Sequence, residues 1–95
     1  MSRKSMVLAN SDRIREIAAD CNTPAIALIG SVARGEDDDD SDCDFLADYS
    51  DDTSFFDVAC MSARLEDLLG CPVDIVSRRV LPAHMAHVAA EAVAL

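Results

Sequence analysis

The feature that most constrains this chain is a crowd of acidic residues beside its most strand-like segment. Ten of the eighteen acidic residues lie between Glu36 and Asp52, a stretch that contains the alternating segment DCDFLADY. In a strand, successive side chains point to opposite faces. One face would carry Cys43, Phe45, Ala47 and Tyr49, and the other Asp42, Asp44, Leu46 and Asp48. The fold must therefore bury one face and keep the charges of the other at its rim.

Helix and strand signals alternate before this segment. A helix is predicted over about 11–21, where Ser11 can cap and apolar residues recur at helical spacing. Pro24 prevents continuation of that helix, and the apolar run Ala25–Ile29 predicts a buried strand. The pair Gly30-Ser31 then turns the chain into the short helical segment SVARG.

The strongest helix signal is DDTSFFDVACMSARLEDLLG, which a capping-box-like pair, Ser54 and Asp57, opens and Gly70 ends. The expected buried stripe is Phe55, Val58, Ala59, Ser62, Leu65 and Leu69. CPVDIVS predicts a third strand, and Pro82 suits the start of a last helix running to Leu95. We expect the chain, 1–95, to form a single domain of helices covering one face of a small sheet and leaving the other partly open.

Composition excludes several classes of protein. With three phenylalanines, one tyrosine and no tryptophan, the core is expected from aliphatic residues, with Phe45, Phe55 and Phe56 as its largest members. The net charge of −10 disfavours direct nucleic-acid binding. There is no apolar run of membrane-spanning length and no secretory signal, and the four cysteines lack CxxC spacing. We therefore expect a cytoplasmic protein with reduced cysteines.

Two aspartates and a turn carry the predicted chemistry. Asp42 and Asp44 would lie on one face of a strand, with Cβ atoms about 7 Å apart, where a hard divalent cation such as Mg²⁺ relieves their repulsion. Asp74, on another strand, could complete a cluster able to hold two metal ions for displacement at phosphorus. Gly30 and Ser31 would offer backbone amides and a hydroxyl to a phosphate.

Simpler interpretations exist for several of these residues. Asp74 could be an edge-strand residue facing water, and Arg34 could reach a phosphate or pair with Glu36 or Asp37. The run Asp37–Asp40 fits a solvated loop. His84 and His87 fit surface positions better than metal ligation.

The segment GSVARGEDDDDSDCDF resembles the Gly-Ser-x₁₀-Asp-x-Asp signature of the DNA polymerase beta-like nucleotidyltransferase superfamily. Its residue pattern is similar to that of the MNT group, the minimal nucleotidyltransferases. Members of that group are commonly encoded beside a HEPN-domain protein and act as its antitoxin. The resemblance covers about 25–78. It implies an α+β fold with a small mixed, partly antiparallel sheet backed by helices.

The resemblance also implies an activity and its residues. Gly30 and Ser31 would bind the phosphates of the nucleotide, while Asp42, Asp44 and Asp74 would be metal ligands and catalytic carboxylates. Arg34 matches the group's Arg-Gly, and its expected place at the nucleotide follows from its position one turn after Ser31. The expected reaction is Mg²⁺-dependent transfer of AMP from ATP to a tyrosine hydroxyl of a HEPN ribonuclease toxin, which neutralises the toxin. The alternative is a non-catalytic antitoxin that neutralises by binding, with a vestigial or nucleotide-sensing site. The partner's identity, the tyrosine and the number of AMP units stay open.

Overall fold

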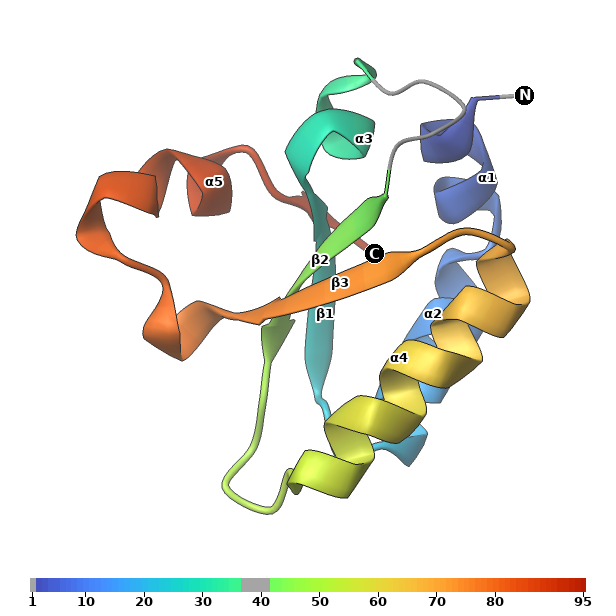
Figure 1. The fold of residues 1–95 in the computed structure, drawn as a ribbon, viewed down its shortest axis with the longest axis vertical. Coiled ribbons are helices and arrows are strands. Elements are labelled where there is room, and N and C mark those ends of the chain that lie inside the picture. The colour runs from blue at the N-terminus through green and yellow to red at the C-terminus, as the bar shows by residue number, and fades with distance from the viewer. Residues whose placement is uncertain (1, 37–41) are drawn as a thin grey trace.

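Helices and short strands alternate along residues 2–36 and 42–95, which the computed structural model describes (Figure 1). The first half comprises α1 (Arg3–Ala9), α2 (Ser11–Asp20), β1 (Ala25–Ile29), α3 (Gly30–Arg34) and β2 (Cys43–Asp48). The second half comprises α4 (Phe55–Leu69), β3 (Val73–Ser77), the 3₁₀-helices η1 (Arg78–Val80) and η2 (Ala83–Met85), α5 (Ala86–Ala90) and β4 (Val93–Ala94).

The strands form one mixed sheet in the order β3-β2-β1-β4. Strand β1 pairs antiparallel with both β2 and β4, whereas β2 and β3 are parallel. A parallel pair requires a long crossover, and the 15 residues of α4 supply it. The predicted α+β class with a partly antiparallel sheet is therefore confirmed.

Helices α1, α2 and α4 lie on one side of the sheet, and the segment from η1 to α5 lies on the other (Figure 1). The predicted core face of β2 is confirmed, since Cys43, Phe45 and Ala47 are fully buried. Leu46, on the opposite face, is also fully buried. That second face is therefore open only near its ends, where Asp44 and Asp48 are half-buried.

Helix α4 confirms the predicted caps and part of the predicted buried stripe. Its N-terminus is a capping box of Ser54 and Asp57, and Gly70 ends it in the left-handed conformation. Phe55 and Phe56, expected in the core, are exposed, because the first turn of the helix extends past the end of the sheet (Figure 1). Leu65 and Leu69 of the predicted stripe are buried, Ala59 is exposed, and Met61 is buried although it was not predicted.

The two ends of the chain also depart from expectation. Helix α1 was not predicted. Ser11, expected to cap α2, is instead the first helical residue of α2, because Asn10 takes the cap position. The predicted C-terminal helix is wrong: α5 has only five residues and is followed by β4, whose Val93 pairs with Leu28 of β1. The unpaired backbone groups of the β1 edge compete with the helix preference of this alanine-rich segment.

In the described residues, no helix is long and apolar enough to cross a membrane. The four cysteines are unbridged, and Cys43 Sγ lies 3.0 Å from Cys71 Sγ in the core.

Candidate functional site

The turn at Gly30 joins β1 directly to α3, without an intervening loop. Gly30 has φ +76°, a left-handed conformation that a side chain disfavours. Ile29 precedes the helix as its cap residue and offers no side-chain hydrogen bond. Ser31, half-buried, stands in the first turn of α3. Strand β1 and the turn are thus placed as the sequence predicts.

The carboxylate of Asp44 packs directly on Gly30. The antiparallel register pairs Ile29 with Asp44, which brings β2 alongside the turn. A Cβ atom at Gly30 would lie only 2.7 Å from Asp44 Oδ2, closer than real Cβ contacts permit. The two halves of the sequence motif, ten residues apart, therefore meet in space, and the glycine makes room for the carboxylate.

Asp74 lies beside Asp44 on the neighbouring strand, because the parallel register of β2 and β3 pairs these two residues. Burial raises the pKa of the Asp44 carboxyl, and the nearby carboxylates of Asp74 and Asp42 raise it further. Asp42 and Asp74 are themselves exposed. The structure thus brings the three predicted carboxylates to the same end of the sheet. Of the three side chains, that of Asp44 is the least exposed to solvent.

This carboxylate group suits a loosely held hard cation better than a closed metal cage. Within residues 2–36 and 42–95, no three acidic, histidine or cysteine side chains stand close enough together to enclose a metal ion. Mg²⁺ keeps several of its waters and takes one or two carboxylates plus substrate phosphate oxygens. The room that Gly30 leaves at Asp44 Oδ2 and the all-oxygen donor set fit such an ion.

Arg34 follows the turn but is engaged by carboxylates. Its guanidinium donates to Glu36, with Nε 3.0 Å from Oε2, and to Glu91, with Nη1 3.4 Å from Oε2. These partners raise the pKa of Arg34, Glu36 most strongly. The pairing with Glu36 was one predicted alternative, whereas Glu91, on the segment after α5, was missed because nothing in a sequence links residues 57 positions apart.

Other predicted positions fall outside this end of the sheet. His84 and His87 are exposed in the segment around η2 and α5, as expected. The run Asp37–Asp40 lies outside the described residues. Two cavities, of about 330 and 250 Å³, both border Thr23 and Pro24 at the junction of α2 and β1 and contain none of the predicted site residues.

Comparison with known proteins agrees with this fold. A family model described as "Polymerase beta, Nucleotidyltransferase" matches residues 12–93. A solved structure provisionally named as a minimal nucleotidyltransferase superimposes with a TM-score of 0.85 at 35% identity, covering 100% of this chain and 97% of that one. A toxin–antitoxin crystal structure with AMP-PNP gives a TM-score of 0.68 at 22% identity, over 83% of this chain and 65% of that one, and shows likeness of fold alone.

Among named relatives, protein adenylyltransferase MntA of Thermococcus cleftensis is 38% identical over 61 residues, 64% of this chain and 62% of that protein. A provisionally named protein adenylyltransferase of Methanocaldococcus jannaschii is 39% identical over 54 residues, 57% of this chain and 55% of that protein. The matches thus span a little over half of the length of these relatives.

Proposed function

Because the chain belongs to the polymerase beta nucleotidyltransferase family, we propose that it transfers AMP from ATP to a tyrosine hydroxyl of a HEPN-domain toxin and so neutralises that toxin. We propose further that residues 1–95 act as a single catalytic domain. The observation that carries the proposal is the contact of Gly30 with Asp44, beside Asp74 in the register. The relatives named protein adenylyltransferases support the kind of group that is transferred.

The proposed reaction is an in-line displacement at phosphorus. The tyrosine oxygen attacks the α-phosphorus of ATP, a new P–O bond forms, and the bond to pyrophosphate breaks. Asp74, exposed at the end of the site, is suited to orient the hydroxyl and accept its proton. The products are the AMP–tyrosine ester, pyrophosphate and one proton.

Asp42 and Asp44 are the proposed ligands of Mg²⁺, with Asp74 able to serve a second ion. When bound, Mg²⁺ would neutralise phosphate charge and align the reacting groups. The backbone at Gly30 and the hydroxyl of Ser31 would hold phosphate oxygens, since a side chain at position 30 would occupy the space beside Asp44. Arg34 can contribute only by exchanging Glu36 or Glu91 for a phosphate.

The test is to incubate the chain with ATP, Mg²⁺ and the proposed HEPN-domain partner, and to measure the partner's intact mass. The expected result is a gain of one or more AMP units, lost when Asp44 is changed to Asn. Asp67→Asn, which removes the same charge from the exposed side of α4, is the matched control and should keep activity. Neutralisation of the toxin with no gain in mass would instead establish the non-catalytic antitoxin.

A further inference from the structure

Two aromatic side chains are exposed to solvent at the N-terminal end of α4. Phe55 and Phe56 are 84% and 83% exposed, the highest values among the large apolar side chains of the described residues. The chain has only three phenylalanines, and Phe45 alone lies in the core. Burying one such ring stabilises a fold by about 1.5–3 kcal/mol, so this small domain forgoes a substantial contribution.

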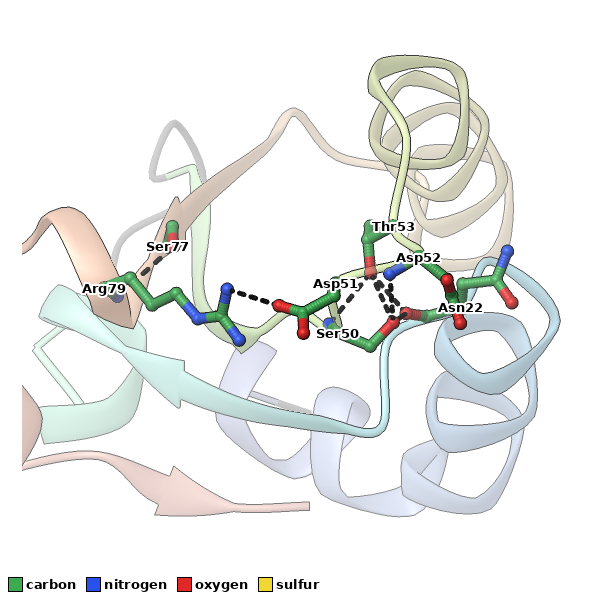
Figure 2. A network of polar contacts seen from close by, with 7 residues as sticks. All are labelled: Asn22, Ser50, Asp51, Asp52, Thr53, Ser77 and Arg79. Carbon is green, nitrogen blue, oxygen red and sulfur yellow. Dashed lines mark hydrogen bonds and ion pairs between the residues drawn. The ribbon is translucent and has the colours of Figure 1, made fainter.

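The segment that presents the two rings is held in place by hydrogen bonds. Asp57 closes the capping box, with its Oδ2 accepting from the Ser54 amide at 2.9 Å, and the same oxygen accepts from Asn22 Nδ2 at 3.0 Å. The Asn22 carbonyl accepts from the hydroxyls of Ser50 and Thr53 (Figure 2). The rings therefore project from an ordered helix start, which lowers the entropy cost of binding.

The surroundings of the two rings are acidic. Asp51 and Asp52 precede them in the loop drawn in Figure 2, and the Asp51 side chain is 96% exposed. Arg79 Nη1 lies 3.4 Å from Asp51 Oδ1, an exposed ion pair of small energetic value. Like-charge repulsion then disfavours nucleic acid, an anionic membrane and a second copy of this chain, whose net charge is −10. Charge complementarity favours a protein with a cationic rim.

The aromatic pair and the candidate active site lie at opposite ends of the sheet. Strand β2 runs from Asp44 at the site to Asp48, and the loop after β2 leads into α4 at the end away from α3 (Figure 1). Four residues of strand span about 13 Å. A protein bound at the aromatic pair would thus leave the aspartates accessible.

We propose that Phe55 and Phe56 form a docking site that inserts into an apolar cleft, rimmed by Lys and Arg, on the toxin partner. This inference rests on the proposed function for the partner's identity. Exposed aromatic residues on an ordered element are typical of residues that dominate binding energy. Docking here holds the partner while its tyrosine reaches the carboxylates at the other end of β2.

The test measures, by calorimetry, the affinity of the chain for the purified HEPN-domain partner of the proposed function. Wild type is compared with Phe55→Ala/Phe56→Ala and with the control Val80→Ala. Val80 is an exposed apolar residue of η1, outside the aromatic pair. The double variant should lose about 30-fold or more in affinity, the effect of removing a dominant contact, while the control and the melting temperature stay near wild type. Affinity within about threefold of wild type would overturn the docking site.

Two further measurements separate this inference from the proposed chemistry. Asp51→Lys/Asp52→Lys should slow association at low salt even if the double alanine variant folds poorly, and an unchanged rate would count against the site. If binding depends on the two rings but no AMP is transferred, the docking site stands and the proposed reaction fails. If AMP is transferred equally by the alanine variant at limiting partner concentration, the reaction stands and the docking site fails. Light scattering that shows a dimer of this chain, lost in the alanine variant, would also refute the toxin as occupant.

Discussion

Replacing Gly30 by alanine tests the contact on which the candidate site is built. The new Cβ would lie 2.7 Å from Asp44 Oδ2 and 3.4 Å from Asp44 Cβ, in a residue with φ +76°. Two costs follow, one from the left-handed backbone and one from displacing the carboxylate. Gly35→Ala isolates the first cost, because Gly35 has φ +73° and a Cβ there would meet nothing within 4 Å.

The two costs can be estimated separately. A left-handed alanine costs about 1–2 kcal/mol, and the reduced entropy of the unfolded chain returns about 0.4–1 kcal/mol. Gly35→Ala should therefore lower the free energy of unfolding by about 1 kcal/mol. Gly30→Ala adds the rotation of the Asp44 carboxylate away from its preferred rotamer, about 0.5–1.5 kcal/mol more. In a domain of this size each 1 kcal/mol of that excess lowers the melting temperature by about 4–8 °C.

The assay is urea unfolding and thermal melting in EDTA, so that no cation masks the carboxylates. Asp44→Ala supplies the decisive second background, since it removes the oxygen that a Cβ at Gly30 would meet. In that background Gly30→Ala should cost no more than Gly35→Ala, which gives a coupling free energy of about 0.5–1.5 kcal/mol. Equal costs for the two glycine variants in the wild-type background, or no relief by Asp44→Ala, would refute the packing of the carboxylate on the turn.

Four other outcomes are expected. Asp42→Asn/Asp44→Asn should abolish AMP transfer, seen by intact mass, yet raise the melting temperature in EDTA because mutual repulsion is removed; a normal transfer rate would contradict the proposed ligands. Native protein should react rapidly with a thiol reagent at the exposed Cys60 but not at Cys43. Burial raises the pKa of the Cys43 thiol from 9.0 to about 12, so the free energy of unfolding should fall as pH rises through that interval, and a flat profile would count against its burial. Changing Asp37–Asp40 to asparagine should slow toxin capture at low salt and matter little at high salt in stopped-flow measurements; an unchanged low-salt rate would leave that run a solvated linker.

Local signals in the sequence were sufficient for the middle of the fold. Pro24 and the apolar run after it located β1, the alternation around Phe45 located β2, and the pair of Ser54 with Gly70 bounded α4. Each of these signals depends on residues within one turn or one strand. The facing of Asp44 and Asp74 was also within reach, because same-face aspartates on neighbouring strands converge wherever the register allows.

The predictions that were wrong concern features that depend on contacts between residues far apart in the sequence. Whether Phe55 is buried or exposed depends on where the sheet ends, and the helical pattern of the sequence does not contain that information. The conversion of the last segment into β4 depends on the free edge of β1. The ion pair between Arg34 and Glu91 also depends on the pairing of β4 with β1, which brings the C-terminal segment back to the sheet. In each case a tertiary neighbour overrides a local preference.

Asp44 concentrates several unfavourable features in one residue. Its carboxylate is half-buried, lies beside Asp74 on the next strand and packs on a glycine held at positive φ. A domain of this size has a total stability of only about 5–15 kcal/mol, so a neutral residue at this position would be the more stable choice for the fold alone. A cation placed among the carboxylates reverses the sign of their interaction. The part of the chain that breaks the local rules of folding is thus the part to which the proposed chemistry is assigned, and binding of a cation with a phosphate would relieve the repulsion that folding leaves there.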